Sequence, residues 1–189
     1  MAVCYNAGNF GEGAKTVLSK LRPHLYLPSV QSVDPRLLRR RGIRGVVLDL
    51  DNTLAGWNAP RPTREVKAWV QRLRGIGIGA VILSNNGRGR VEDFAGWLGV
   101  PYIPHARKPW ARGFRKAMTV LGTTPQSTAV IGDQVFTDIL GGNRVGMFTI
   151  LVTPLTRQEF VGTKAVRHVE GAVLHHFART GLRVPSSAG

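Results

Sequence analysis

The sequence is poor in cysteine and has no long apolar run. Its 189 residues include one cysteine, Cys4, which excludes an internal disulfide and favours a reducing compartment. No apolar stretch approaches the roughly 18 residues that a transmembrane helix needs. The first residues also lack the basic region and apolar segment of a secretory signal peptide. These absences predict a cytoplasmic protein that is soluble or bound peripherally to the inner face of the cell membrane.

Acidic residues are scarce as well. The chain has 11 Asp and Glu against 26 Lys and Arg, for a formal net charge of +15. Such a surface attracts anions, which include phosphate groups, nucleic acid and acidic bilayers. A genome-wide bias toward arginine would give the same balance without any anionic partner. With 43% hydrophobic and 20% charged residues, the composition is that of a globular chain of single-domain length.

Short apolar runs alternate with helical patterns along the middle of the chain. The runs are rich in Val and Ile and end at Gly, Pro, Asn or Asp, which is typical of strands buried on both faces. Between them, apolar residues recur at i, i+3, i+4 and i+7. The runs cover 44–50, 78–84, 100–103, 128–132 and 147–152, and the helical patterns cover 66–73, 91–98, 114–121 and 136–140. The alternation predicts an α/β fold with a three-layer, doubly wound, Rossmann-like parallel sheet.

Charged and polar side chains follow several of the predicted strands. The carboxyl ends of parallel strands meet at one edge of a sheet, so residues far apart in the sequence converge there. These residues are Asp49 and Asp51 after the first run, Ser84 and Asn85 after the second, Asp133 and Asp138 in GDQVFTD, and Lys108 at the start of the third helix.

Two carboxylates about 4 Å apart repel by roughly 4 kcal/mol at an effective dielectric of 20, so the cluster needs a divalent cation and an amine. Oxygen ligands without His or Cys favour Mg²⁺ over Zn²⁺, and Mg²⁺ beside a carboxylate nucleophile favours phosphoryl transfer.

The order D-L-D-N-T, S-N, K-P and G-D-x-x-x-x-D resembles the haloacid dehalogenase (HAD) phosphatase superfamily over about residues 44–152. The resemblance implies that Asp49 is the nucleophile that forms an aspartyl-phosphate. It implies that Asp51 protonates the leaving oxygen and then activates water. Mg²⁺ would bind the Asp49 carboxylate, the Asp51 backbone carbonyl and Asp133.

The same resemblance assigns supporting roles to the other residues. Thr53 would hold Asp51 or its loop and line the phosphate site. Ser84 would grip phosphate oxygens, and Asn85 would shape the loop or touch the substrate. Lys108 would stabilise the nucleophile and the transferring group. Asp138 would support the metal site or Lys108 from behind.

Many members of the superfamily enclose small substrates under an inserted cap, for which this chain has little room. The core is therefore expected to be HAD-like and essentially capless, which suits a large substrate or a headgroup presented by a surface. The spare segment is AGWNAPRP (55–62), a flap whose Trp57 is either a lid contact or a packing residue.

Within the superfamily, the chain resembles subclass IIIA, namely YqeG-like proteins and phosphatidylglycerophosphate phosphatases. The features that carry this likeness are LRPHLYLPSV (21–30), IRGVVLDLDNTL, LSNN and IGDQVFTDILGGN. It implies that the substrate is phosphatidylglycerophosphate, an anionic phospholipid, and the product phosphatidylglycerol. The alternative is a soluble HAD phosphatase for a nucleotide, a sugar phosphate or a nucleic-acid end.

The chain outside the predicted core divides into two segments. Residues 1–42 are expected to form a basic, amphipathic segment before the catalytic core, which covers residues 43–155. Residues 156–189 are expected to form a C-terminal helix and a loose tail after it. The stretches VLSKLRPHLYLP (17–28) and RLLRRRGIR (36–44) mix apolar, aromatic and basic residues, which favours contact with an acidic bilayer. Equally, the apolar residues would pack on the sheet while the arginines remain in water.

Overall fold

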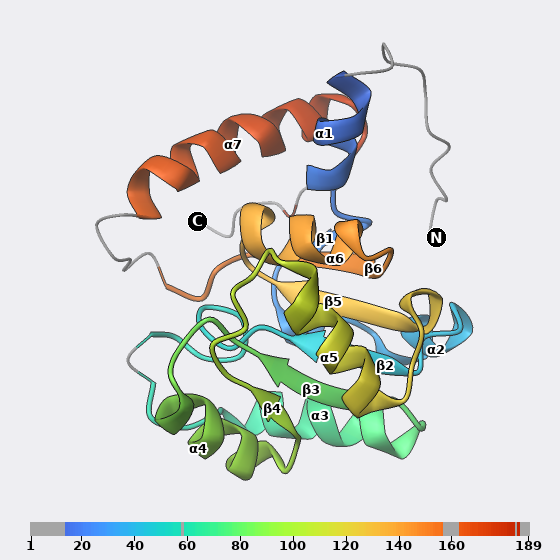
Figure 1. Cartoon of the computed structure of the whole chain (residues 1–189), viewed down its shortest axis with the longest axis vertical. Coiled ribbons are helices and arrows are strands. Elements are labelled where there is room, and N and C mark those ends of the chain that lie inside the picture. The colour runs from blue at the N-terminus through green and yellow to red at the C-terminus, as the bar shows by residue number, and fades with distance from the viewer. Residues whose placement is uncertain (1–13, 58, 157–162, 184, 186–189) are drawn as a thin grey trace.

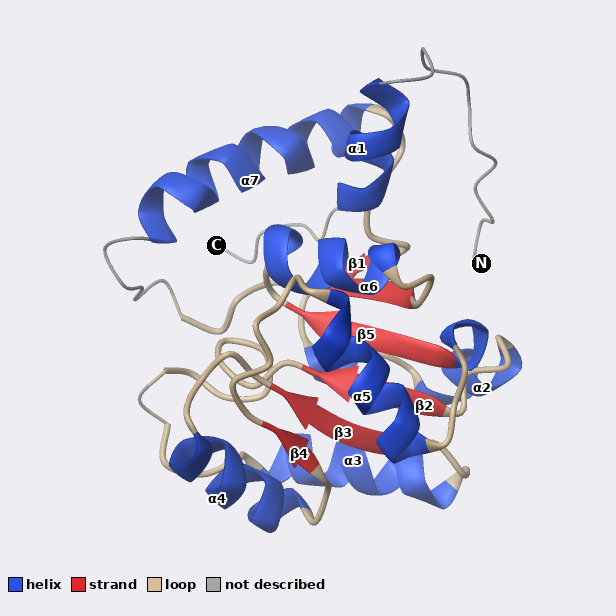
Figure 2. Cartoon of the chain, in the orientation of Figure 1, coloured by secondary structure: helices blue, strands red, loops and turns tan. Residues whose placement is uncertain are grey.

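The computed structural model describes residues 14–57, 59–156, 163–183 and 185, so Cys4 lies outside the described part. It confirms the predicted α/β class. A parallel sheet of six strands has the order β1-β6-β5-β2-β3-β4, and helices cover both of its faces (Figures 1 and 2). The sheet is open, and its strand order reverses direction beside β2, as in doubly wound folds.

The strands are short and apolar. Their bounds are β1 Leu25–Leu27, β2 Gly45–Leu48, β3 Gly79–Leu83, β4 Tyr102–Ile103, β5 Thr128–Gly132 and β6 Phe148–Val152. In the centre, Val47 of β2 lies opposite Val81 of β3 and Val130 of β5. All four residues of β2 are buried, because helices pack on both sides of it.

Helices α2 to α6 connect successive strands, whereas α1 precedes β1 and α7 follows β6. Their bounds are α1 Ala14–Leu21, α2 Pro35–Arg40, α3 Arg64–Gly75, α4 Arg88–Leu98, α5 Ala111–Leu121, α6 Leu140–Arg144 and α7 Thr163–Arg179. A single π-helical turn, Val135–Ile139, precedes α6, and 3₁₀ turns lie at Val30–Ser32 and Pro125–Ser127. The helix predicted at 136–140 is thus a π-turn that continues into α6. No helix in the described ranges is long and apolar enough to cross a membrane.

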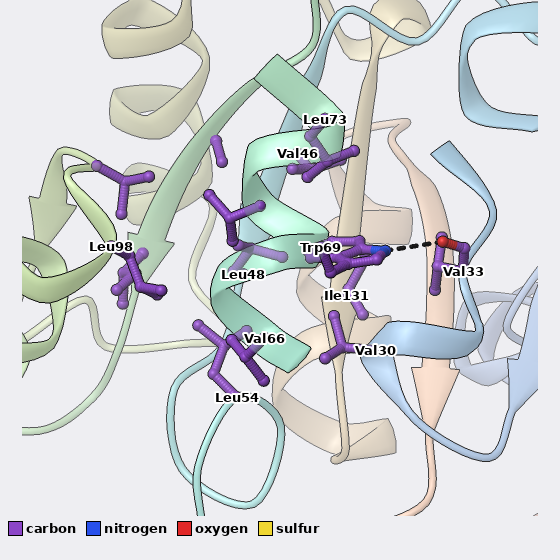
Figure 3. Packing of buried hydrophobic residues seen from close by; sticks show 14 of the residues in the cluster. Val30, Val33, Val46, Leu48, Leu54, Val66, Trp69, Leu73, Leu98 and Ile131 are labelled. Atoms are coloured by element: carbon purple, nitrogen blue, oxygen red, sulfur yellow. Dashed lines mark hydrogen bonds between the residues drawn. The ribbon is translucent and has the colours of Figure 1, made fainter. Parts of the chain in front are cut away.

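Helices α3 and α4 cover one face of the sheet. Side chains alternate along a strand, so Val46 and Leu48 of β2 point to this face, where they join the same buried cluster as Trp69 of α3. Trp69 is fully buried, and its indole Nε1 donates a hydrogen bond of 2.8 Å to the carbonyl of Val33 (Figure 3). This hydrogen bond links the chain before β2 to helix α3.

Helices α5 and α6 cover the opposite face. There Val47, Val81 and Val130 form a buried cluster with Phe114 of α5. Farther along this face, Leu21 of α1 and Phe177 of α7 pack with Leu151 of β6. The sheet is therefore the middle of three layers.

The first strand was not predicted from the sequence. Residues Leu25–Leu27 pair in parallel with Ile150–Val152 of β6 and form an edge of the sheet. The His24 amide adds a hydrogen bond of 2.9 Å to the Thr149 carbonyl. Three residues are too few to show a strand pattern in the sequence.

The two edges of the sheet carry different parts of the chain. All strands are parallel, so the loops after β2, β3, β4, β5 and β6 gather at the carboxyl edge, where α3, α4 and α5 begin. Helix α2 and the arginine run, the stretch RLLRRRGIR at 36–44, lead into β2 and therefore lie at the amino edge. In Figure 1 the arrowheads of β3 and β5 point left, whereas α2 is at the right.

Candidate active site

A lysine and three aspartates are buried together at the carboxyl edge. Asp49 follows β2, Asp133 follows β5, Asp138 lies in the π-turn, and Lys108 comes from the loop between β4 and α5. The Lys108 ammonium donates to Asp49 Oδ1 at 2.5 Å and to Asp138 Oδ1 at 2.7 Å. Four separate segments of the chain thus meet in one ion cluster.

This cluster is short of positive charge. Asp49, Asp133, Asp138 and Lys108 are each at most 8% exposed, and their formal charges sum to −2. Burial alone would lower the pKa of Lys108, but the carboxylates of Asp138 and Asp49 outweigh it, so the pKa is raised and the amine stays protonated. Burial raises the pKa of Asp138 to about 6, although the Lys108 charge opposes the rise. One lysine does not balance three buried carboxylates.

A divalent cation fits this arrangement. Carboxylate oxygens of Asp49, Asp133 and Asp138 all lie within 4.8 Å of one another, and oxygen ligands suit a hard cation. Asp138 has both of its oxygens engaged, Oδ1 by Lys108 and Oδ2 by the Gln134 amide at 3.2 Å. Asp49 and Asp133 are therefore the better candidates for direct ligands, and Asp138 is placed to orient the lysine.

Two small residues keep this cluster compact. Thr53 is buried, and its hydroxyl donates to Asp133 Oδ1 at 3.5 Å, so it faces the candidate metal ligand rather than Asp51. Gly132, the last residue of β5, lies directly beneath the Asp138 carboxyl group. A Cβ atom at this position would overlap the Cβ, Cγ and Oδ2 atoms of Asp138.

The loop after β3 supports the lysine loop. The Asn85 side chain accepts a hydrogen bond of 2.7 Å from the Lys108 amide and donates one of 3.4 Å to the Lys108 carbonyl. Ser84 is 2% exposed, and its hydroxyl accepts from the Asn86 amide at 3.1 Å. Asn85 therefore positions the backbone of Lys108, and Ser84 lies at the base of the same loop.

The Asp51 carboxylate lies beside Asp49 and is bound by two residues that sequence analysis did not single out. Asn86 donates to Asp51 Oδ2 at 2.6 Å, and Arg90 donates from Nε to Asp51 Oδ1 at 2.9 Å. Burial and the neighbouring Asp49 carboxylate raise the pKa of Asp51 above its ordinary value, although Arg90 and Asn86 oppose the rise. A carboxyl group with a raised pKa is suited to donate a proton near neutral pH.

Arg90 also fixes the flap that follows Asp51. Its guanidinium donates to the carbonyls of Ala59 and Gly56, at 2.9 and 3.0 Å, on either side of Trp57. A sequence signal was available, because Arg90 lies in the first turn of α4 and the first turn of such a helix faces the carboxyl edge. Its partners, by contrast, are set by the path of the flap and were not readable from the helical pattern.

The site has no separate domain over it in the described part of the chain. After β2 the chain reaches α3 at Arg64 through the loop that contains the flap, and after β3 it reaches α4 at Arg88 through residues 84–87. Trp57 in the flap is 40% exposed. Within the described residues, these two connections are thus loops without an inserted domain.

Known proteins share this sequence pattern. Residues 105–168 match the family described as HAD-hydrolase-like. Over 159 residues the chain is 37% identical to a probable phosphatase, YqeG, of Bacillus subtilis, and the match covers 84% of this chain and 92% of that protein. A chloroplast phosphatidylglycerophosphate phosphatase of Chlamydomonas reinhardtii is 32% identical, with 87% of this chain and 65% of that protein covered. A phosphatidylglycerophosphate phosphatase of Arabidopsis thaliana is 29% identical, with 85% of this chain matched, and the chain spans about half of its length (49%).

Proposed function

The chain belongs to the HAD-like hydrolases and is a HAD-type phosphatase, similar in sequence to YqeG. From this premise we propose that it is a Mg²⁺-dependent phosphatase whose substrate is phosphatidylglycerophosphate at a membrane surface. The observation that carries the chemistry is the contact of Asp49 with Lys108 inside the buried acidic cluster. The observation that favours this lipid is the 29–32% identity to two proteins named for its dephosphorylation.

In the proposed reaction, Asp49 is the nucleophile. Its carboxylate oxygen bonds to phosphorus while the bond from phosphorus to the glycerol oxygen breaks, which leaves an aspartyl-phosphate. Lys108 holds Asp49 in place and offsets negative charge on the transferring group. Mg²⁺, when held by Asp49, Asp133 and the Asp51 backbone carbonyl, would reduce the repulsion between the anionic nucleophile and the anionic phosphate.

Asp51 moves the protons. With its raised pKa it gives a proton to the departing glycerol oxygen, and the resulting carboxylate then takes a proton from the water that attacks phosphorus. Phosphate leaves, and both aspartates return to their starting states. Arg90 and Asn86 keep the Asp51 carboxyl group directed at this position throughout.

Ser84, Asn85 and Thr53 complete the site in this proposal. Ser84 binds oxygens of the transferring phosphate, Asn85 sets the backbone of Lys108, and Thr53 steadies Asp133. Asp138 acts on the reaction through its contact with Lys108.

The basic surface also suits a second candidate, a phosphatase for nucleotides, sugar phosphates or nucleic-acid ends, because the chain carries a formal net charge of +15. The test is a panel of phosphomonoesters with Mg²⁺ and again with a chelator. It includes phosphatidylglycerophosphate in mixed micelles, glycerol 3-phosphate, nucleoside monophosphates, sugar phosphates and an oligonucleotide with a terminal phosphate. We expect the lipid to have the highest kcat/KM and the chelator to abolish its turnover. A panel led by a nucleotide or sugar phosphate would replace the lipid assignment, and full activity in the chelator would remove the metal.

A further inference from the structure

The loops around the mouth of the site carry exposed apolar side chains. We propose that Trp57, Trp110 and Leu155 form a docking rim that sets the mouth directly against an anionic phospholipid bilayer. This inference rests on the proposed lipid substrate and adds to it the surface by which the enzyme meets that lipid. The arginine run at the amino edge is not that surface.

The rim residues are the exposed large hydrophobic residues of the carboxyl edge. Trp57, Trp110 and Leu155 are 40%, 68% and 45% exposed, and they belong to the loops after β2, β4 and β6, respectively. Strand order places β6 and β4 on opposite sides of β2, so the rim flanks the buried cluster on both sides. The other exposed large hydrophobic residues of the described chain lie within helices: Leu18, Trp97 and Val120.

Each rim residue is attached to a loop of the site. The Leu155 amide donates to the carbonyl of Asn52, next to Asp51, at 3.0 Å. Trp57 lies between two carbonyls that Arg90 binds while it also holds Asp51. Trp110 is two residues beyond Lys108, and its amide donates to the Arg107 carbonyl at 3.0 Å. A membrane surface that binds the rim therefore also lies against the loops of the site.

The charge of these loops complements an acidic bilayer. Segments 55–63, 84–88, 104–112 and 153–156 contain no Asp or Glu. Their arginines are exposed: Arg107 and Arg112, together with Arg61, which lies over the Trp97 ring, and Arg88, which pairs with Glu92. Tryptophan concentrates at membrane–water interfaces, and arginine beside it is attracted to anionic headgroups. The aromatic and basic character of the rim thus points to a lipid surface of negative charge.

The arginine run faces the other way. Arg36, Arg39, Arg40 and Arg44 are exposed, but they precede β2 and lie at the amino edge. If this run bound the bilayer, the sheet would stand between the membrane and the site, and the mouth would open to water. Docking through the rim instead brings a lipid phosphate to the site without its leaving the membrane.

Vesicle flotation separates the two surfaces. The probe is vesicles of phosphatidylglycerol and phosphatidylcholine, with pure phosphatidylcholine as the uncharged comparison. We expect the wild type to float with the anionic vesicles, and the Trp57→Ser/Trp110→Ser double variant to bind them at least roughly tenfold more weakly, because it loses two apolar anchors. Val120→Ser removes an exposed apolar side chain at the far end of α5, and Arg39→Gln/Arg40→Gln removes charge at the amino edge. Both should bind within about twofold of the wild type.

A second measurement places the tryptophans directly. In a Trp97→Phe background, the remaining exposed tryptophans are Trp57 and Trp110, since Trp69 is fully buried. Vesicles whose acyl chains carry bromine should quench their fluorescence, and removal of both should abolish the quenching.

The outcomes also separate this proposal from the phosphatase assignment. Turnover of soluble para-nitrophenyl phosphate reports the site itself, without any membrane. If the active wild type fails to float, or if the Arg39→Gln/Arg40→Gln variant alone loses binding, the docking rim is wrong while the phosphatase assignment stands. If the wild type floats through the rim but hydrolyses no phosphomonoester, the rim stands and the proposed reaction is wrong.

Discussion

At the carboxyl edge of the sheet, Lys108 and Asp138 form an ion pair whose side chains are 3% and 1% exposed. At the amino edge, Arg40 and Asp34 form one at 3.8 Å whose side chains are 67% and 53% exposed. The two pairs are chemically alike, but water screens the second and not the first. The ion pair at the carboxyl edge should therefore contribute much more to stability than the pair at the amino edge. Mutations at the two edges should differ accordingly in their effects on stability and activity.

The largest difference is expected in catalysis. Asp49→Asn keeps the shape of the side chain but removes the nucleophile, so kcat/KM for any phosphomonoester should fall by at least ~10⁴. Asp93→Asn, at an exposed position of α4, should leave it unchanged. Steady-state kinetics measure both, with circular dichroism to verify folding. Normal turnover by a folded Asp49→Asn protein would contradict the assignment of Asp49.

The next effect concerns stability. Lys108→Met leaves buried carboxylates without their amine, and in chelator it should lower the free energy of unfolding by about 3–5 kcal/mol. The loss should grow as the pH rises above about 6, the pKa of Asp138 beside Lys108, because the wild type ionises Asp138 there whereas removal of the lysine raises this pKa further and disfavours the ionised carboxylate. Urea denaturation at two pH values tests this.

The matched control for that change is an exposed lysine on α5, the helix that follows the Lys108 loop. Lys116→Met removes an exposed lysine of α5 and should change the free energy of unfolding by no more than about 0.5 kcal/mol. Equal stabilities of the Lys108 and Lys116 variants would show that the buried lysine is not needed to balance the acids.

Arg90 is expected to have an intermediate effect. Arg90 lowers the pKa of Asp51, so Arg90→Gln should raise that pKa further and move the alkaline limb of the rate profile to higher pH. Loss of its positioning bonds should also reduce kcat roughly tenfold, a part of the 10²–10⁴ that a general acid contributes. The measurement is a pH–rate profile with an alkyl phosphomonoester, whose leaving group needs a proton.

Two comparisons isolate this effect. Para-nitrophenyl phosphate has a leaving group that departs without a proton, so its alkaline limb should not move in Arg90→Gln. Arg88→Gln, from the same turn of α4 but exposed and paired with Glu92, should behave as the wild type with both substrates. If Arg90→Gln and the wild type gave identical profiles, Arg90 would have no effect on the pKa of Asp51, and the prediction would be wrong.

The smallest effect is expected at the amino edge. Arg40→Gln breaks the exposed pair with Asp34 and should change the free energy of unfolding by less than about 0.5 kcal/mol, with less change still in high salt. Thermal denaturation at low and high salt provides the measurement. A loss as large as that of Lys108→Met would overturn the contrast between the two edges.

The elements with strong periodicity were predictable from the sequence. Strands β2, β3 and β5 are runs of Val and Ile, and α3 places Trp69 and its neighbours at helical spacing, so composition and period agree with burial. Their order then fixed which loops share the carboxyl edge. This is why Asp49, Lys108 and Asp133, distant in the sequence, could be expected in one place.

The remaining features depend on tertiary contacts. Strand β1 exists because Leu25–Leu27 finds the free edge of β6, which no local pattern announces. Asn86 and Arg90 acquire their importance from the direction of the Asp51 side chain and from the path of the flap. Such partners belong to the folded chain rather than to any short stretch of it.

Gly132 has a consequence for reading other genomes. A side chain at this position and a carboxyl group at the place of Asp138 exclude each other, since they would occupy the same volume. Any homologue that has the lysine and the aspartates but a larger residue here must have moved the carboxyl group off the lysine. We expect such homologues to keep the fold but to have lost the phosphatase activity. The residue at this one position would then distinguish active enzymes from inactive relatives.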